Sequence, residues 1–198
     1  MNHTIDIVVE GYPDEVACRK LCEFMGIRIN RIFNKRGKNR LDISLGGYNA
    51  DSHYRQRYWL ALRDLDRDAG CAFQLIEQLV PERSPYFLFR IPVRAIEAWF
   101  MGDSNRLGNF LAISHARIST TPEQIEYPKQ AMVNLARRSR QRDIRADMVP
   151  TQGSNHDEGP AYASRLAEFA ENHWRPEIAE RASDSLARCI RRLRAINN

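Results

Sequence analysis

The chain has 198 residues, of which 43% are hydrophobic and 28% are charged, and it carries a formal net charge of +5. This length fits one domain, or one domain with an extension, and the composition is sufficient to fill a hydrophobic core. No apolar run reaches the roughly 18 residues of a membrane-spanning helix, and the first residues do not resemble a signal peptide. We therefore expect a cytoplasmic protein that does not bind a membrane, and the basic charge balance favours a polyanionic partner such as nucleic acid.

The cysteines match neither a disulfide framework nor a zinc site. Cys18, Cys22, Cys71 and Cys189 lack the paired spacing of zinc ligands, and four cysteines are too few for a disulfide-stabilised fold. Cys18 and Cys22 would share one face of a helix, where we expect buried thiols.

Strand-like and helix-like segments alternate through the first hundred residues. Short runs of branched and aromatic residues predict strands at residues 4–9, 28–33, 58–62 and 86–91. Other segments predict helices at residues 15–25, 49–57, 71–79 and 95–101, with a turn at Gly46–Gly47. This alternation is typical of a parallel α/β sheet of about four strands flanked by helices, in which ligands bind outside the carboxyl ends of the strands.

The strand signal ends near Ser104. Beyond this residue the sequence predicts helices at residues 127–140 and 162–172, a polar loop at 150–160, and a last helix capped by Ser183 or Asp184. We therefore expect an α/β core at residues 1–103 and a mainly helical C-terminal extension at residues 104–198, packed on that core.

Three aspartates follow the apolar strand at residues 58–62. If the chain stays extended, alternation places Asp64, Asp66 and Asp68 on the same side of the backbone. Crowded carboxylates repel one another and are best tolerated around a cation, and oxygen ligands suit Mg²⁺ or Mn²⁺ better than zinc. The alternative is a charged, solvated loop.

Basic residues gather around Gly37. Lys35, Arg36, Lys38 and Arg40 lie in a segment predicted to be a loop between two strands, where they would bind the phosphates of nucleic acid. The alternative is a solvated surface loop. His156, in the polar loop at residues 150–160, is expected at the surface.

Two acidic motifs in this order define a resemblance. Glu10–Gly11 with Asp14, followed by Asp64–Leu65–Asp66, is similar to the TOPRIM domain of topoisomerases, primases and overcoming-lysogenization-defect type nucleases. The chain resembles more closely an uncharacterised bacterial TOPRIM-like family that is often encoded beside ATPases. Further motifs carry that closer resemblance: Glu97–Ala98–Trp99, Asp103, Gly159–Pro160–Ala161–Tyr162 and the segment 183–188.

The resemblance implies a TOPRIM-like fold and roles for its residues. It implies that Glu10, Asp64 and Asp66 are catalytic, with Glu10 as acid/base or metal ligand and the two aspartates holding Mg²⁺. Glu97 and Asp103 belong to the smaller family alone; beside a strand end, Glu97 would either pair with an arginine or join the metal cluster. Taken together, the predicted metal ligands are Glu10, Asp14, Asp64, Asp66, Asp68 and Glu97.

The leading functional prediction is a metal-dependent nuclease acting on DNA or RNA. The family resemblance adds a partner ATPase and a role in phage defence, and the sequence is compatible with a homo-oligomer. The DxD motif alone also occurs in haloacid-dehalogenase-like phosphatases and nucleotide-sugar glycosyltransferases. The phosphatases need an earlier nucleophilic aspartate and a later lysine, and residues 104–198 contain Lys129 alone. The non-enzymatic alternative is a TOPRIM-like regulatory subunit of an ATPase complex.

Overall fold

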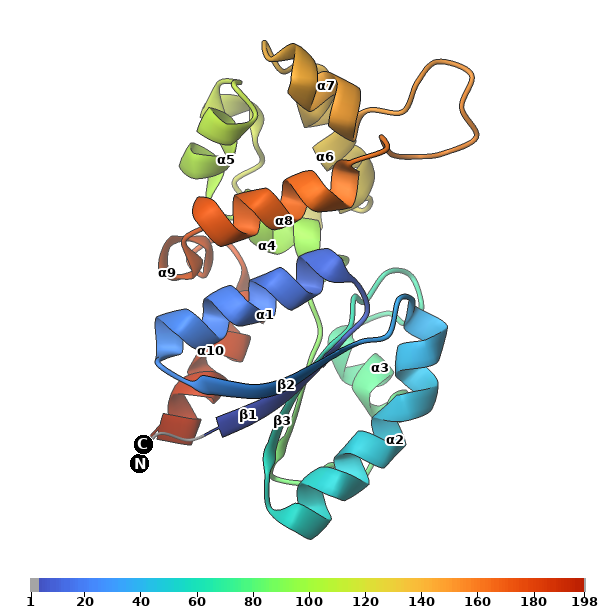
Figure 1. Cartoon of the computed structure of the whole chain (residues 1–198), viewed down its shortest axis with the longest axis vertical. Helices are drawn as coiled ribbons and strands as arrows, with labels where there is room; N and C mark the ends of the chain where they lie inside the picture. Colours follow the sequence, from blue (N-terminus) through green and yellow to red (C-terminus); the bar gives the residue numbers. More distant parts are fainter. Residues whose placement is uncertain (1–3, 198) are drawn as a thin grey trace.

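The computed structural model describes residues 4–197, so the outer ends of the two predicted units, residues 1–3 and 198, lie outside the described residues. Four parallel strands form one sheet in the order β2-β1-β3-β4 (Figure 1). Their bounds are β1 Thr4–Val9, β2 Arg28–Asn34, β3 Tyr58–Leu62 and β4 Phe87–Arg90. The predicted α/β class with a four-stranded parallel sheet is therefore confirmed.

Helices cover both faces of the sheet. Alternation along β1 directs Ile5, Ile7 and Val9 towards the face covered by α1 (Tyr12–Met25) and α10 (Asp184–Asn197). Val8 lies in the second apolar cluster, with α2 (Lys38–Arg55) and α3 (Ala72–Leu79). The apolar runs of the strands are thus buried on both sides, as in other parallel sheets.

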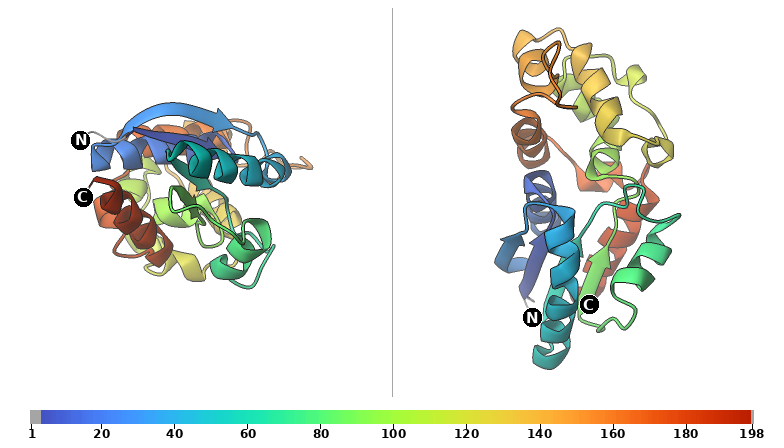
Figure 2. Two further views of the ribbon diagram at one scale, coloured as in Figure 1. Left: turned by 90° about the horizontal axis from the view of Figure 1, so that it is seen from below. Right: turned by 90° about the vertical axis from the view of Figure 1, so that its right-hand side faces the viewer.

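The remaining helices follow the last strand. They are α4 (Ile96–Met101), α5 (Ser104–Phe110), α6 (Pro128–Arg137), α7 (Arg142–Met148), α8 (Tyr162–Asn172) and α9 (Pro176–Ala179), with 3₁₀ turns at His115–Arg117 and Pro122–Gln124. Helices α5, α6 and α7 gather at one end of the molecule, and α8 runs beside α1 (Figures 1 and 2).

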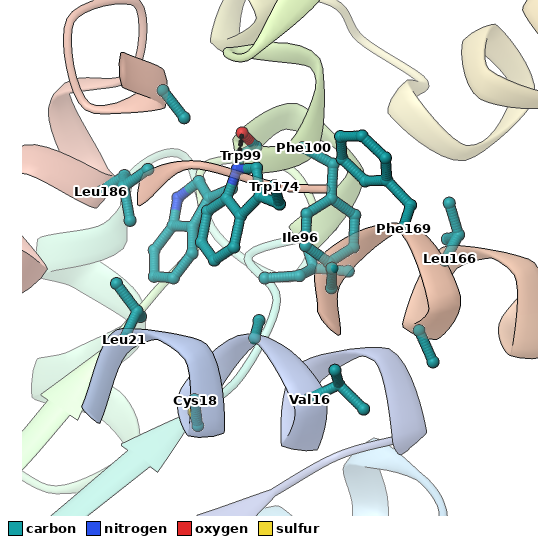
Figure 3. Close-up of a cluster of buried hydrophobic side chains, with 14 of the residues drawn as sticks. Val16, Cys18, Leu21, Ile96, Trp99, Phe100, Leu166, Phe169, Trp174 and Leu186 are labelled. Atoms are coloured by element: carbon teal, nitrogen blue, oxygen red, sulfur yellow. Dashed lines mark hydrogen bonds between the residues drawn. The ribbon is translucent and has the colours of Figure 1, made fainter. Parts of the chain in front are cut away.

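One apolar core joins the sheet to these helices. Figure 3 shows the part where α1, α4 and α8 meet, and where the Trp174 indole N–H donates to the Trp99 carbonyl over 3.3 Å. The Phe100 ring meets the rings of Phe169 and Trp174 edge-on at 5.9 and 5.4 Å. This core contains residues from both sides of the boundary predicted at residue 103, and the division into two units stays a prediction.

Helix α2 differs most from its prediction. The predicted loop around Lys38 and the predicted turn at Gly46–Gly47 are both wrong, because one continuous helix runs from Lys38 to Arg55. Leu41 and Leu45 are completely buried against the sheet, and this packing holds the helix through two glycines that disfavour it. Tertiary contacts therefore overrode the local signal.

Other expectations about the chain can be compared with the structure. Helices α5, α7 and α9 were not predicted, whereas α8 has its predicted bounds. No disulfide joins the four cysteines, which all lie within the described part of the chain, and Cys18 and Cys22 are buried. Between residues 4 and 197, no helix is long and apolar enough to cross a membrane.

Candidate acidic site at the carboxyl edge of the sheet

Parallel pairing brings two distant acidic segments to one edge of the sheet. Val9, the last residue of β1, lies opposite Leu62, the last residue of β3. Glu10 and Asp64 follow these strand ends at the same edge, although more than fifty positions separate them in the sequence.

Two helices add a carboxylate each. Asp14 lies in the first turn of α1, where its Oδ2 accepts a hydrogen bond of 2.9 Å from the Gly11 backbone N–H. Glu97 lies in the first turn of α4, which follows β4. We refer to Glu10, Asp14, Asp64 and Glu97 as the inner cluster.

Three carboxylates of the inner cluster have an unsatisfied oxygen. Among the described residues, no hydrogen-bond partner is found for Glu10 Oε2, Asp14 Oδ1 or Asp64 Oδ1, and all three atoms are buried. Buried polar groups are normally hydrogen-bonded, because desolvation without a partner is costly. These oxygens are therefore candidates to hold a proton or a cation.

Burial and mutual repulsion act together on the inner cluster. Burial raises the pKa of Asp14 to about 8, and the charges of Glu10 and Glu97 add to the shift. Burial also raises the pKa of Asp64 well above its ordinary value, with further contributions from Asp14 and Glu97. The pKa values of Glu10 and Glu97 are raised as well, chiefly by burial. Without a cation, the cluster retains protons at pH values where isolated carboxylates are ionised.

Asp66 and Asp68 lie outside the inner cluster. The condition for placing the three aspartates on one side, an extended backbone after β3, is not met, because residues 66–67 form a turn and Asp66 has a left-handed φ of 50°. Lys38 donates to Asp66 over 3.2 Å and to Asp68 over 3.0 Å. Burial alone would raise the pKa of Asp68, but hydrogen bonds from Lys38 and Arg63 lower it. Asp66 still adds to the raised pKa values of Glu10 and Asp64.

The four basic residues around Gly37 are distributed over different surroundings. Lys38 lines the cavity that contains Asp66, whereas Lys35 and Arg40 line another cavity between β2 and α2. Lys35 Nζ lies 3.4 Å from the Tyr48 hydroxyl, and Arg36 is exposed. Binding of nucleic acid by these residues stays a prediction.

The C-terminal helices contribute two residues that the sequence did not indicate. The Tyr162 hydroxyl donates to Glu97 Oε1 over 3.0 Å, and Lys129 Nζ lies 2.8 Å from Glu158 Oε2. Partial burial disfavours the charged form of Lys129, yet the carboxylates of Glu158 and Glu97 keep its pKa above the usual value. Two signals in the sequence could have pointed to them. Lys129 is the single lysine of residues 104–198, and Tyr162 belongs to a motif that had no assigned role.

Three other candidate residues have identified surroundings. Within the described chain, Glu97 is bonded to Tyr162 and not to an arginine, so the arginine pairing considered for it is not observed. Asp103 is instead the residue paired with an arginine, since Arg175 Nε and Nη2 donate to it over 2.9 and 2.8 Å. His156 is exposed in the polar loop, and its backbone N–H donates to Ser154.

A cavity of about 460 Å³ lies beside the acidic residues. Its wall combines Lys38, Asp66, Arg67, Arg94, Tyr127 and Lys129. The Arg67 guanidinium lies 4.2 Å from the centre of the Tyr127 ring, and Arg94 donates to the Asp66 carbonyl over 3.1 Å. The same wall also carries Asp68, Glu126 and Asp157, so the four cationic side chains are matched by four carboxylates. The cavity therefore offers both signs of charge, and its cations could contact a phosphate where a metal ion offsets the carboxylates.

The acidic residues do not form a ready-made metal centre. Over residues 4–197, no group of three or more His, Cys, Asp or Glu side chains is arranged to hold a metal ion. The predicted ligand set Glu10, Asp14, Asp64, Asp66, Asp68 and Glu97 therefore stays a prediction. The site is nevertheless rich in oxygen donors, the ligand type that Mg²⁺ and Mn²⁺ prefer.

Together, the fold and the site define an α/β protein with a buried acidic cluster at the carboxyl edge of a parallel sheet. Comparison of the chain with protein-family models, with curated proteins and with solved structures gave no match. The resemblance to the TOPRIM domain therefore rests on the sequence motifs and stays a prediction.

Proposed function

We propose that this chain is a metal-dependent nuclease that hydrolyses phosphodiester bonds in DNA or RNA. One observation carries the proposal: Glu10, Asp14 and Asp64 each have a buried oxygen without a hydrogen-bond partner among the described residues, and Glu10 and Asp64 follow β1 and β3 at the edge where ligands bind parallel α/β sheets. The cavity that contains Asp66 supplies lysine and arginine side chains for a phosphate alongside its carboxylates.

The donor atoms fit Mg²⁺ or Mn²⁺ in kind. Glu10, Asp14 and Asp64 would hold the ion through carboxylate oxygens, with Asp66 and Glu97 as neighbouring carboxylates. Once bound, such an ion polarises the phosphate and lowers the pKa of a bound water molecule. An ion would also remove the repulsion that raises the pKa values of the cluster.

The other residues of the site would bind and orient the substrate. Lys38 and Lys129 place ammonium groups on two sides of the cavity, and both lie near carboxylates that keep them charged. Arg67 and Arg94 present guanidinium groups that bind phosphate oxygens without reading a base sequence. Tyr162 holds Glu97 by its hydroxyl and thereby restricts the orientation of that carboxylate.

The direct test is cleavage by the purified chain. Single-stranded and double-stranded DNA and RNA are incubated with Mg²⁺, with Mn²⁺ or with EDTA, in the presence and absence of any ATPase that is encoded beside the gene. We expect cleavage that requires the metal and that falls by about 10³-fold in Asp64→Asn. Asp143→Asn, which alters an exposed aspartate of α7, is the matched control and should cleave like the wild type.

Metal binding has a readout that does not depend on activity. Mn²⁺ should raise the melting temperature of the wild type and of Asp143→Asn, because an ion that binds the folded state stabilises it. Asp64→Asn should show a much smaller increase. Equal increases in all three proteins would remove Asp64 from the metal site.

A non-catalytic regulatory subunit of an ATPase complex is the second candidate. It is favoured by the finding that, among the described residues, no set of ligands is already arranged around a metal position. A wild-type chain that cleaves none of the substrates, yet changes the rate of ATP hydrolysis by the neighbouring ATPase, would establish this function in place of the first. Both the ATPase partner and the link to phage defence follow from the family resemblance.

A further inference from the structure

The outward face of α2 has an unusual composition for a surface helix. Six residues spaced three or four apart share this face, and all six are exposed: Asn39, Ile43, Gly46, Gly47, Ala50 and Tyr54. The exposed fractions of Ile43 and Tyr54 reach 87% and 89%. None of the six side chains carries a charge. We call this set the α2 stripe.

The α2 stripe lies opposite the buried side of the helix. Leu41, Leu45 and Ser52 are completely buried and face the sheet. A surface helix normally carries charged and polar residues on the side facing away from its core. The right-hand view of Figure 2 looks onto α2, which runs along the surface of the molecule between β2 and α3.

The two central glycines have no role within a single copy. A Cβ atom added to Gly46 or Gly47 would meet no described atom within 4 Å, and neither glycine has a positive φ. Glycine weakens a helix interior, whereas it permits another backbone to approach closely. The pair therefore indicates a close contact with something outside this chain.

The α2 stripe is symmetric about its two glycines. Asn39 and Tyr54 lie equally far from the midpoint between Gly46 and Gly47, and so do Ile43 and Ala50. A two-fold axis at this midpoint would pair the helix with an antiparallel copy of itself, as in other isologous interfaces. Each Ile43 side chain would then face the small Ala50 of the second copy.

The charges that flank the stripe obey the same symmetry. Arg40 and Asp51 lie along one margin of the stripe, and Asp42 and His53 lie along the other. In the antiparallel arrangement, the exposed Arg40 comes near Asp51 of the second copy, whereas Asp42 on the other margin is already bound by Arg63 of its own chain at 3.0 Å. Asp51 is partly exposed and pairs with Arg55 at 2.8 Å, so Arg40 of the second copy would be a further cation beside it, which favours this partner over an unrelated surface.

We infer that two copies of this chain form a two-fold symmetric dimer through antiparallel contact of their α2 helices at Gly46–Gly47. Three properties converge on a second copy as the partner: the uncharged exposed stripe, the glycines that leave room for a backbone, and the approach of Arg40 to Asp51 of the second copy. The interface uses α2 alone and does not depend on the proposed nuclease activity.

Analytical ultracentrifugation of the full chain tests the dimer. We expect a monomer–dimer equilibrium, and we expect Ala50→Glu to weaken it by about 100-fold, because two carboxylates would be buried near the axis. Ala146→Glu changes an exposed alanine of α7 and should dimerise like the wild type. A wild type that stays monomeric at every concentration, or an Ala50→Glu variant that dimerises equally well, would overturn the inference.

Gly47→Ala provides a second variant that keeps the helix intact. At low protein concentration the monomer should melt at a higher temperature, because alanine favours the helix and its Cβ meets no described atom within 4 Å. The dissociation constant of the dimer should rise about tenfold, because the added methyl groups separate the helices. A dimer that is unchanged or tighter in this variant would place the interface elsewhere.

Discussion

Two kinds of buried carboxylate occur in this molecule, and they are balanced differently. Asp6 and Asp103 are both completely buried, yet each is bonded to arginine. Asp6 accepts from Asn30 at 2.7 Å and from Arg31 at 3.1 Å, and Arg175 holds Asp103 with two donors. Burial would raise the pKa of Asp6, but its hydrogen bonds to Arg31 and Asn30 lower it instead.

The inner cluster is buried without such partners. Glu10, Asp14 and Asp64 each have an oxygen for which no described residue provides a hydrogen bond, and their pKa values are raised. Burial of an acidic residue therefore does not identify a functional site in this fold. Among the described residues, no lysine or arginine is bonded directly to Glu10, Asp14 or Asp64, and this distinguishes the cluster from the arginine-paired acids.

The largest expected effect on stability concerns the arginine-paired acid Asp103. Asp103→Asn should lower the free energy of unfolding by about 2 to 3 kcal/mol, because the completely buried carboxylate loses charge-assisted hydrogen bonds from Arg175, whose side chain is 35% exposed and stays partly solvated. Urea denaturation measures the loss, and Asp143→Asn is the matched control. A loss as small as that of the control would mean that Arg175 does not compensate the burial of Asp103.

The next effect is the pH dependence that Asp14 confers. Its pKa in the folded state is about 8, compared with an ordinary value of 3.8, so the folded state binds more protons between these pH values. In the presence of a metal chelator, the free energy of unfolding should therefore fall by about 2 kcal/mol as the pH rises from 6 to 8. Above the pKa of the folded state it should level off. Asp14→Asn should remove most of this slope. An unchanged slope in the variant would assign it to other groups.

A smaller effect, of the opposite sign to that of Asp103, is expected at Asp64. At pH 8 in the presence of a chelator, Asp64→Asn should raise the free energy of unfolding by about 1 kcal/mol, because the neutral amide needs no proton and avoids the burial and repulsion that disfavour an ionised Asp64. Thermal or urea unfolding measures the change. A destabilised variant would class Asp64 with the structural acids, and the distinction between the two kinds of carboxylate would fail.

The smallest effect is expected at the rim of the site. Asp68 is partly exposed and pairs with Lys38 and Arg63. Asp68→Asn should cost no more than about 1 kcal/mol, because solvent screens the exposed pair with Lys38 and the buried Arg63 keeps Asp42 as its partner. Added salt should reduce the difference from the wild type further. If Asp68→Asn lowered the free energy of unfolding as much as Asp103→Asn does, the exposure of an acidic residue would not determine how much its ion pair contributes to stability.

Local sequence patterns were sufficient to place the sheet and the edge at which Glu10 and Asp64 lie. The branched and apolar runs at residues 4–9 and 58–62 coincide with β1 and β3. Because parallel strands end at a common edge, the positions of Glu10 and Asp64 after these runs predicted their placement at that edge. This reasoning needs only the two-residue period of a strand and the parallel arrangement.

Which carboxylates are neutralised was decided by the tertiary structure. Asp64, Asp66 and Asp68 lie at alternate positions of the sequence. A turn at Asp66 nevertheless redirects the chain, and Lys38 binds Asp66 and Asp68 but not Asp64. Lys38 is available to them because α2 begins at that residue, where the sequence predicted a loop. The helix begins there because Leu41 and Leu45 pack on the sheet.

The contribution of the C-terminal half was also beyond the reach of local patterns. Tyr162 bonds to Glu97 across 65 positions of the sequence, and Lys129 acts on the same carboxylate from α6. Backbone periodicity depends on neighbouring residues, and so a sequence window reveals it. The partners of a charged side chain depend on which distant helices pack against it, and only the folded chain determines that arrangement.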